Sequence, residues 1–419
     1  MMYGVYFGPH FAGHLASERG RMTFAYSDEW AAGPRHQLSV RMPVRREPYD
    51  HDASNAYFAN LLPEDEHKRL LASVLGASAR QVGPLLGAIG GECAGAVSIW
   101  PEGSAPDAVA RYEPLSDDEI AVLMSDAGGP ARRALTREGR LSLPGGMDKI
   151  ALRRFGSRWE RPVNGAPTTH ILKWAPDDKR DLSLNEHFTL ELLRAAGLPT
   201  VETEVLLEAP RVLVIRRDDR VDARDGGGIA LLHQEDFCQA SAVDPALKYQ
   251  SDGGPSIVQC AKVVRECAET PAREIARLLD WTVAGFLTGN MDGHAKNLAL
   301  MHVQGGISLA PFFDMSCSAI YRQLKKMAMT IGGEYRIAYV QSRHWQALGV
   351  ELGVRWRAVH ERATFLSDRI EASLPAVRSA HAERYGDLPM YDQVERTVRS
   401  QLDRLRRSMA EAGRTSGGR

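Results

Sequence analysis

The sequence has few cysteines, no excess of either charge and no long apolar run. Its five cysteines are scattered and form no Cys-x-x-Cys pair, which argues against a disulfide framework and against a zinc site. No apolar segment approaches the roughly 20 residues of a membrane helix, and the first residues lack the charged start and apolar core of a signal peptide. With 52 basic against 53 acidic residues, the chain has no global attraction for nucleic acid. We therefore expect a cytoplasmic protein without a membrane partner, in which any DNA contact is a local patch.

The sequence also lacks the best-known signatures of phosphate chemistry. It contains no Gly-x-x-x-x-Gly-Lys-Ser/Thr loop, no His-Arg-Asp triplet and no Asp-Phe-Gly triplet. A kinase with this sequence would therefore be an atypical one. What is present is the composition of an ordinary folded protein, with 44% hydrophobic and 25% charged residues. A length of 419 residues allows two to three compact units.

The order of the predicted elements divides the chain into three parts and a short tail. Residues 1–110 are expected to form an α+β subdomain, and residues 111–235 a small antiparallel sheet with one helix. Residues 236–412 are expected to be mostly helical with one β-hairpin, and residues 413–419 to be a disordered tail. The predicted fold class is α+β, with a β-rich N-terminal part and a mostly helical C-terminal lobe.

Hydrophobic periodicity predicts the individual elements within these parts. Strands are expected at residues 2–6, 22–25, 38–41, 94–100, 141–143, 150–153, 168–174, 203–207, 211–216, 298–303 and 307–310. Helices are expected at residues 63–75, 115–127, 184–196, 257–268, 271–288, 342–351, 358–374 and 391–412. Strands thus dominate before residue 235 and helices after it.

A loop after the predicted helix 271–288 carries the residue types that phosphoryl transfer needs. Asp292 is followed at the fifth position by Asn297, the spacing at which a kinase catalytic loop places its base and a metal-binding amide. Asp314 follows the second strand of the predicted hairpin, which returns the chain towards this loop. Because Mg²⁺ prefers one or two hard oxygen ligands from protein, Asn297 and Asp314 are the predicted metal ligands.

A nucleotide-binding set is expected in the second part of the chain. The turn from Pro144 to Lys149 contains two glycines, which leave backbone N–H groups uncrowded enough to cradle phosphates. Lys173 on the next strand can reach the α- and β-phosphates, and Glu186 on the following helix can anchor that lysine. Arg216-Arg217-Asp218 ends the last strand at an expected hinge, where its backbone can contact an adenine edge.

Each of these features alone has a simpler explanation. The Asp-x-x-x-x-Asn spacing arises by chance in many chains of this size, and a glycine turn before a lysine is more often an ordinary hairpin. His294 is either a nucleotide contact or a structural histidine that caps the loop. The order of the features favours phosphoryl transfer, because a glycine turn, strand lysine, helix acid, hinge, catalytic loop and metal aspartate follow one another as in a two-lobed kinase. The prediction is an atypical protein-kinase-like fold.

Five motifs follow one another in the sequence between about residues 57 and 315. They are Tyr57-Phe58-Ala59-Asn60-Leu61-Leu62-Pro63, Gln234-Glu235-Asp236, Lys248-Tyr249-Gln250-Ser251-Asp252-Gly253-Gly254-Pro255, Asp292-Gly293-His294-Ala295-Lys296-Asn297 and Pro311-Phe312-Phe313-Asp314. Together they resemble the HipA family of kinase toxins of type II toxin–antitoxin systems. Their combination is far more specific than any one of them, and the resemblance covers nearly the whole chain.

The resemblance implies ATP and Mg²⁺ as cofactors and a role for each site residue. Asp292 matches the catalytic base, Asn297 and Asp314 the metal-binding positions, and Lys173 the phosphate-contacting lysine. The expected ATP contacts are Pro144, Gly145, Gly146, Met147, Asp148, Lys149, Lys173, Arg216, Arg217, Asp218, His294, Ala295, Lys296, Asn297, Phe313 and Asp314. Ser142 falls where the family autophosphorylates, an event that ejects the phosphate loop and silences the kinase. A phosphate adds roughly −2 charge beside a turn suited to the phosphates of ATP, which explains the inhibition.

The resemblance also implies a bacterial cytoplasmic toxin with particular partners. Its substrate is expected to be a serine of an aminoacyl-tRNA synthetase, with the glutamyl enzyme as first choice, so that translation stalls and growth arrest and persistence follow. Its antitoxin is expected to be a HipB-like helix-turn-helix dimer that carries most of the operator DNA contacts. The hinge departs from the family, whose first position is usually acidic and third aromatic. Residues 332–344 contain no counterpart of the family's lysine-rich DNA-contacting stretch.

Two other functions remain open from the sequence. The chain can be a corepressor that mainly stabilises an antitoxin on DNA, with the kinase fold as a scaffold. It can also be a kinase of a small molecule, because the phosphate chemistry is the same and the acceptor site leaves no readable motif.

Overall fold

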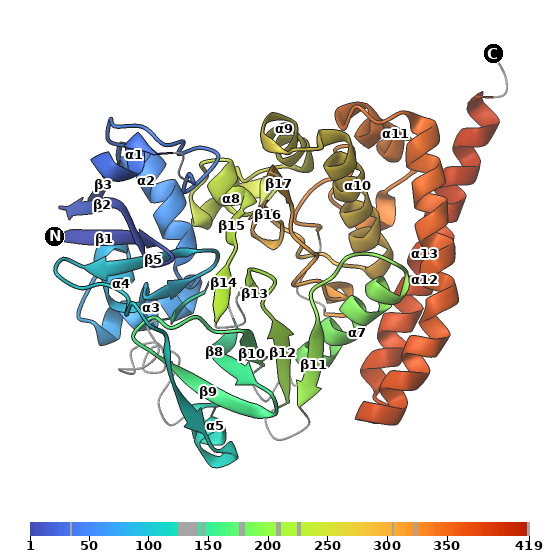
Figure 1. Ribbon diagram of the computed structural model, residues 1–419. Helices are drawn as coiled ribbons and strands as arrows, with labels where there is room; N and C mark the ends of the chain where they lie inside the picture. Colours follow the sequence, from blue (N-terminus) through green and yellow to red (C-terminus); the bar gives the residue numbers. More distant parts are fainter. Residues whose placement is uncertain are drawn as a thin grey trace. The chain divides into compact units, whose positions relative to one another are not determined.

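The computed structural model describes residues 1–33, 36–124, 141–143, 147–175, 181–206, 211–223, 228–303, 306–321, 324 and 326–416. The chain forms two compact units, and the elements of both are labelled in Figure 1. The first unit comprises residues 1–174, 214–246 and 299–304. The second comprises residues 175–213, 247–298 and 305–419. Neither unit is therefore a single continuous segment of the chain.

A four-stranded antiparallel sheet forms the N-terminal part of the first unit. Its order is β3-β2-β1-β5, with β1 at Met2–Phe7, β2 at His10–Glu18, β3 at Arg21–Tyr26 and β5 at Val97–Pro101. The helices of this part are α1 (Asp28–Ala32), α2 (His51–Phe58), α3 (Asp65–Val74) and α4 (Val82–Ile89). Alternate strand side chains such as Val5, Leu15 and Phe24 enter one apolar core, and α2 and α4 pack against the strands.

A second sheet of the first unit presents two faces of different character. Its strands run in the order β12-β10-β8-β9-β6, with β6 at Arg111–Leu115, β8 at Asp148–Phe155, β9 at Arg158–Val163, β10 at His170–Trp174 and β12 at Val212–Arg216. Helix α5 (Asp117–Met124) follows β6. Leu152 and Leu172 are buried on one face, and because side chains alternate along a strand, Lys149 and Lys173 project from the other.

Short strand pairs and one short helix complete the description of the first unit. The pairs are β4 (Glu92–Cys93) with β7 (Leu141–Ser142), β13 (Arg220–Asp222) with β14 (Ile229–Leu231), and β15 (His233–Asp236) with β16 (Ala299–Val303). The pair β4–β7 is parallel, and the other two are antiparallel. Helix α8 (Phe237–Ala240) begins in a capping box, in which Asp236 accepts from the N–H of Gln239.

The second unit is mostly helical. Its helices are α7 (Leu182–Ala195), α9 (Ile257–Cys267), α10 (Pro271–Thr288), α11 (Ser342–Glu351), α12 (Trp356–Tyr385) and α13 (Pro389–Ser416), and its strands are β11 (Thr203–Leu206) and β17 (Gly306–Leu309). Helix α10 contacts α9, α12 and α13 and buries Leu278 and Phe286. Helices α12 and α13 run side by side (Figure 1). The predicted α+β class, with a β-rich N-terminal part and a helical C-terminal part, is confirmed.

Two helices have the predicted bounds, and one predicted strand is wrong. Helices α10 and α11 span residues 271–288 and 342–351, as the hydrophobic periodicity indicates. Residues 38–41 form no strand. The N–H of Leu38 donates to the hydroxyl of Tyr26 at 2.8 Å, and the N–H of Val40 donates to Glu235 Oε1 at 2.9 Å. These backbone groups therefore bond to side chains instead of to a neighbouring strand.

Helix α12 does not end before Pro375, where the sequence predicts its end. A proline inside a helix removes one hydrogen bond and costs roughly 3 kcal/mol. Packing offsets this cost, because the part of α12 beyond Pro375 buries His381 and Tyr385. The ring nitrogen Nε2 of His187 on α7 lies 3.1 Å from the hydroxyl of Tyr385.

The predicted disordered tail at residues 413–419 is wrong for its first four residues. Helix α13 continues to Ser416, so residues 413–416 are helical, and residues 417–419 lie outside the described residues. A helix that is already formed passes through a single glycine such as Gly413 at a cost of about 1 kcal/mol.

None of the helices in the described ranges has the length and apolar composition that crossing a bilayer requires.

Candidate active site

Helix α10 ends at Gly289, and the loop that follows carries Asp292 and Asn297. Gly289 adopts a left-handed backbone with a φ of 67°, and its N–H donates to the carbonyl of Phe286 at 3.2 Å. A side chain at this position would clash, because a Cβ would lie 2.8 Å from Cγ2 of Thr397. The glycine therefore ends the helix and sets the direction in which the catalytic loop leaves it.

Hydrogen bonds hold this loop on two sides. The N–H of Met291 donates to Oγ of Ser318 at 2.7 Å, and the carbonyl of Met291 accepts from the N–H of Ala328 at 2.9 Å. The carbonyl of Asp292 accepts from Nδ2 of Asn297 at 3.0 Å. The two residues that the sequence pairs by spacing are therefore also paired by a direct hydrogen bond.

The carboxylate of Asp292 is half-buried and accepts a hydrogen bond from a tyrosine. The hydroxyl of Tyr249 donates to Oδ1 of Asp292 at 2.8 Å. A general base must lie within hydrogen-bond reach of the hydroxyl whose proton it accepts. A carboxylate on this loop is a group of the type that can serve as one.

Asn297 and Asp314 supply oxygen atoms of the type that Mg²⁺ prefers. Asn297 uses its amide nitrogen in the bond to Asp292, which leaves Oδ1 as the atom that can bind a metal. Asp314 is half-buried and has a φ of 53°, a left-handed conformation that is uncommon for a residue with a side chain. The register just before it is fixed, because the N–H of Phe312 donates to the carbonyl of Pro199 at 2.7 Å. An amide oxygen and a carboxylate fit a magnesium site that phosphate and water complete.

In the first unit, Lys149 and Lys173 stand directly opposite each other on β8 and β10. Directly opposed side chains on neighbouring antiparallel strands have Cβ atoms about 4.5–5.5 Å apart, and like charges in such pairs repel. Both lysines are half-buried. The pair therefore places two cationic groups of the type that binds phosphate side by side on this sheet.

The predicted phosphate loop is described only at its end. Pro144, Gly145 and Gly146 lie outside the described residues. Met147 is half-buried just before β8. Asp148, the first residue of β8, has Oδ1 3.0 Å from Nε2 of His67 on α3. This side chain therefore contacts a helix of the N-terminal part of the first unit.

Ser142, the predicted autophosphorylation site, is fully buried in β7. Its hydroxyl donates to the carbonyl of Leu61 at 2.7 Å, and the strand pairs with β4 through Cys93 opposite Ser142. A buried hydroxyl that already donates a hydrogen bond cannot meet ATP where it lies. Phosphorylation of Ser142 therefore requires β7 to leave β4 first.

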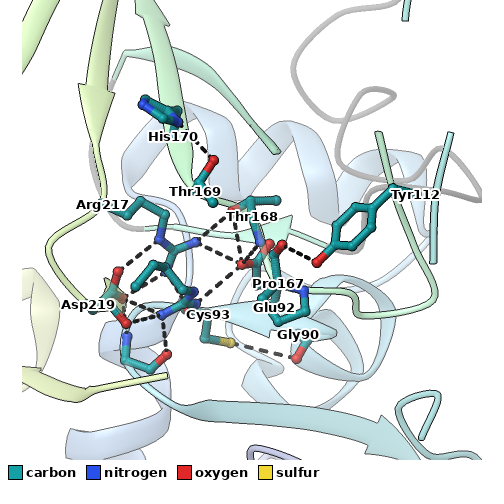
Figure 2. Close-up of polar contacts among 12 residues, drawn as sticks. Gly90, Glu92, Cys93, Tyr112, Pro167, Thr168, Thr169, His170, Arg217 and Asp219 are labelled. Carbon is teal, nitrogen blue, oxygen red and sulfur yellow. Dashed lines mark hydrogen bonds and ion pairs between the residues drawn. The ribbon is translucent and has the colours of Figure 1, made fainter. Parts of the chain in front are cut away.

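The predicted hinge contributes its middle residue to a buried charge network, which Figure 2 shows. Arg217 contacts Glu92 at 3.1 Å and Asp219 at 2.8 Å, and Arg220 contacts the same two carboxylates at 3.3 and 2.9 Å. Both arginine side chains are only 2% exposed. The N–H of Arg217 donates to the carbonyl of Thr169 at 2.9 Å. The side chain and N–H of Arg217 thus bond within the first unit, and its carbonyl is the group left for an adenine contact.

The network ties the strand β4 to the end of β12. Nη2 of Arg217 and Nη2 of Arg220 donate to the carbonyl of Cys93 at 2.9 and 3.1 Å. Glu92 also accepts from the N–H of Thr168 at 2.8 Å, and Asp219 accepts from the N–H of Gly95 at 2.7 Å. Because β4 pairs with β7, the same network supports the strand that contains Ser142.

Asp218 sits beside this network with a strongly shifted pKa. Burial raises the pKa of Asp218 to about 7, and the neighbouring Asp219 carboxylate adds to the rise. Burial acts in the same direction on Asp219, but Arg217 and Arg220 outweigh it and lower the pKa of Asp219 to about 2. Two guanidinium groups are thus balanced by the carboxylates of Glu92 and Asp219. A third charged carboxylate would upset this balance, which agrees with the raised pKa of Asp218.

The other predicted nucleotide contacts differ in exposure. His294, Ala295 and Lys296 are buried in the catalytic loop, and the ring of His294 meets the ring of Tyr249 edge to face at 5.3 Å. Phe313 is half-buried, and Arg216 is exposed at the end of β12. The His294 contact supports the loop-stabilising alternative for this residue without excluding the other.

Glu186, the predicted anchor of Lys173, is 5% exposed on α7. Its neighbour Asn185 brackets the chain beyond Asp314, since its Oδ1 accepts from the N–H of Cys317 at 2.8 Å and its Nδ2 donates to the Cys317 carbonyl at 3.1 Å. Burial raises the pKa of the Cys317 thiol to about 12, so this cysteine is a packing residue. The pairing of Glu186 with Lys173 stays a prediction.

Two family models match this chain, one over residues 141–374 and the other over residues 3–100. The model described as the HipA-like C-terminal domain matches residues 141–374, which is more than half of the chain. The chain belongs to the HipA family. The model described as the HipA N-terminal domain matches residues 3–100.

Individual relatives of the HipA family cover almost the whole chain. "Putative kinase Y4mE" of Sinorhizobium fredii is 33% identical, over 91% of this chain and 93% of its own length. The protein named serine/threonine-protein kinase toxin HipA of Shewanella oneidensis is 24% identical, over 89% and 88%. A solved structure of Shewanella oneidensis HipA with HipB and operator DNA superposes with a TM-score of 0.83 at 22% identity and covers 97% of each chain. The predicted two-lobed, kinase-like HipA fold is confirmed.

Two of the HipA-like motifs make hydrogen bonds to other segments of the first unit. Glu235 accepts from the N–H of Val40 at 2.9 Å and from the hydroxyl of Ser39 at 2.5 Å, and it lies 2.9 Å from Nε2 of His302. From the other motif, Asn60 donates to the carbonyl of Val243 at 2.9 Å. These motifs therefore fix the N-terminal part against the β15–β16 strands and have a structural role that the sequence did not reveal.

Sequence reasoning missed the residues that support the site. Tyr249 lies within a recognised motif, but its bond to Asp292 has no local signal, because 43 residues separate the two. Glu92, Asp219 and Arg220 are likewise not among the site residues predicted from the sequence. Arg216-Arg217-Asp218-Asp219-Arg220 is a run of five charged residues, and such a run is usually a solvated surface. Its position directly after the buried β12 residues is the signal that could have suggested otherwise.

Proposed function

We propose that this protein is an ATP-dependent serine/threonine protein kinase with Asp292 as its catalytic base. One observation carries the proposal, namely the loop in which the Asp292 carboxylate accepts a hydrogen bond from Tyr249 and Asn297 bonds to the Asp292 carbonyl. Phosphoryl transfer needs an oriented acceptor and metal-held phosphates more than covalent help from the protein. This loop supplies the groups for both needs.

In the proposed reaction, the acceptor hydroxyl oxygen bonds to the γ-phosphorus of ATP. The bond from the γ-phosphorus to the oxygen bridging to the β-phosphate breaks, and ADP leaves. The proton of the hydroxyl passes to the Asp292 carboxylate. General bases of this kind contribute roughly 10²–10⁴-fold to a rate.

Nucleotide and metal are assigned to the residue sets described above. Lys149 and Lys173 are the proposed phosphate contacts, because they place two cationic side chains opposite each other on neighbouring strands. The turn from Pro144 to Lys149 is the proposed phosphate loop, and Arg216-Arg217-Asp218 the proposed adenine edge. Asn297 and Asp314 would hold Mg²⁺, which neutralises phosphate charge when it is bound. His294, Ala295, Lys296 and Phe313 complete the proposed nucleotide contacts.

We propose a protein acceptor and a toxin role from membership of the HipA family. The first candidate acceptor is a serine of an aminoacyl-tRNA synthetase, with the glutamyl enzyme tested first. Its phosphorylation in the bacterial cytoplasm would stop translation and promote growth arrest and persistence. We propose a HipB-like helix-turn-helix dimer as the antitoxin and the main carrier of operator DNA contacts. The formal net charge of −1 supports this division.

We further propose that phosphorylation of Ser142 silences the kinase. The burial of this hydroxyl and its bond to Leu61 support a two-step event, in which β7 first leaves β4 and then accepts phosphate. A phosphate of roughly −2 charge cannot return to a buried position without large desolvation cost. Serine 142 would therefore act as a lasting brake.

The test is transfer of labelled γ-phosphate from ATP to a panel of purified tRNA synthetases. The wild-type protein and the isosteric Asp292→Asn variant are compared under the same conditions, with a metabolite fraction as a second acceptor pool. Label on a synthetase with wild type, and at least about 100-fold less with the variant, is the expected result. Equal transfer by both proteins would overturn the proposal, and label in the metabolite fraction alone would replace the protein acceptor with a small one.

A second measurement separates the kinase from the corepressor function. Binding of the antitoxin to operator DNA is measured with wild type, with Asp292→Asn and without this chain. We expect both forms of this chain to tighten binding equally, because Asp292 lies in the proposed reaction and not in an assembly contact. Tightening together with no substrate modified in the first test would favour the corepressor.

A further inference from the structure

Tyr249 donates a hydrogen bond to the proposed base, and the residue has no role among the site residues predicted from the sequence. Its hydroxyl lies 2.8 Å from Oδ1 of Asp292, and its ring meets the ring of His294 edge to face at 5.3 Å. His294 belongs to the same loop as Asp292. Tyr249 therefore touches the catalytic loop at two points, once through its hydroxyl and once through its ring.

The turn that carries Tyr249 is built around two glycines. Gly253 has a φ of 102°, which a residue with a side chain rarely adopts. The N–H of Gly254 donates to the carbonyl of Tyr249 at 2.9 Å, and a Cβ at Gly254 would lie only 2.0 Å from the carbonyl oxygen of Leu247. The glycines thus allow the chain to fold tightly back on Tyr249 and fix its backbone.

The same turn is bonded to the segment that supports the catalytic loop. The N–H of Gln250 donates to the carbonyl of Ala328 at 3.2 Å, and Oε1 of Gln250 accepts from the N–H of Thr330 at 2.8 Å. The N–H of Ala328 donates to the carbonyl of Met291, the residue before Asp292, at 2.9 Å. Tyr249 and Asp292 are therefore fixed to one common strip of backbone, at residues 328–330.

We infer that Tyr249 is a positioning residue for the reaction, which holds the Asp292 carboxylate in the rotation that accepts the proton of the acceptor hydroxyl. The inference rests on the proposed kinase function. A carboxylate on a loop has several rotations of similar energy, and the Tyr249 hydroxyl at 2.8 Å favours one of them. Tyr249 acts through Asp292 and does not touch the reacting phosphate.

The test compares Tyr249→Phe with wild type in steady-state phosphate transfer. The phenylalanine keeps the ring contact with His294 and removes only the hydroxyl. We expect kcat to fall on the order of tenfold, a part of the contribution of a general base, while KM for ATP stays unchanged. Tyr339→Phe is the matched control, because Tyr339 is in the same unit and 56% exposed. We expect its kinetics to match those of wild type.

A double variant separates positioning from a general effect on the fold. In the Asp292→Ala background, Tyr249→Phe is expected to change the residual rate less than twofold, because the carboxylate that it orients is gone. Equal losses in both backgrounds, or a KM that rises while kcat holds, would overturn the inference. Phosphate found on the Tyr249 hydroxyl by mass spectrometry would also overturn it, because Tyr249 would then be an acceptor. Full activity of Asp292→Ala alone would instead refute the proposed kinase mechanism.

Discussion

Asp218 and Asp219 are adjacent aspartates whose replacement by asparagine should change stability in opposite directions. Asp219 neutralises Arg217 and Arg220, which are both buried. Asp219→Asn removes that charge, and loss of one partner from a buried ion network costs about 3–5 kcal/mol. Asp218 is instead the surplus carboxylate beside a balanced network, so Asp218→Asn removes a group that the folded state keeps protonated.

The size of the Asp218 effect follows from its pKa. The pKa is about 7 in the folded protein against an ordinary value of 3.8. Each unit corresponds to roughly 1.4 kcal/mol, so ionising this group at pH 8 costs the folded state about 4 kcal/mol. Because the folded pKa is raised, the proton favours folding below about pH 4, and that stability is lost as the pH rises to about 7. Asp219 has the opposite sign, since its lowered pKa contributes stability above about pH 4 that is lost towards pH 2.

The assay is urea unfolding of wild type and both variants at pH 5 and pH 8. Asp218→Asn is expected to gain about 3 kcal/mol more relative to wild type at pH 8 than at pH 5. Asp219→Asn is expected to be destabilised at both pH values. The double variant should be less stable than the two single effects predict, because Asp218 can no longer ionise in place of Asp219. An Asp218→Asn variant that is destabilised at pH 8, or equally affected at both pH values, would refute the charge-balance reasoning.

Three further predictions concern the metal, a tight turn and the HipA-like motif. Asn297→Ala should raise the Mg²⁺ concentration for half-maximal phosphate transfer about tenfold with the fold intact, which a titration and circular dichroism check together. Gly95→Ala should cost roughly 3 kcal/mol in urea unfolding, because its φ is 74° and a Cβ would lie 2.7 Å from the backbone of Gln234. Gly103→Ala, with a similar φ of 82° and open space around it, should cost only about 1 kcal/mol. Glu235→Gln should lower unfolding free energy by roughly 2–4 kcal/mol, since three groups donate to or contact that buried carboxylate.

Most of the helices and strands could be predicted from signals in the local sequence. Helix α10 has an apolar face, a proline at its start and a glycine at its end, so its bounds were predictable to the residue. Helix α12 shows the limit, because the local rule ends a helix before Pro375, whereas packing of His381 and Tyr385 carries it further. Tertiary contacts of that kind leave no mark in the neighbouring sequence.

The site was predictable where chemistry dictates spacing. Asp292 and Asn297 are separated by a fixed number of residues, and the bond between them follows from that closeness in sequence. The role of Tyr249 could not be predicted, because 43 residues separate it from Asp292 in the sequence and the two side chains meet only in the folded chain. The buried ion pair of Arg217 with Glu92 could not be predicted either, because 125 residues separate the two in the sequence.

The network around Arg217 also decides where this protein cannot be cut. Glu92, Cys93 and Gly95 belong to the stretch that matches the HipA N-terminal domain, and Thr168, Arg217 and Asp219 to the stretch that matches the HipA-like C-terminal domain. A fragment starting after residue 100 would keep two guanidinium groups and lose the Glu92 carboxylate and the Cys93 carbonyl that bind them. The two matched domains occupy separate parts of the sequence, but residues of both bond to one another in a single buried network. The two domains should therefore be expressed and engineered together.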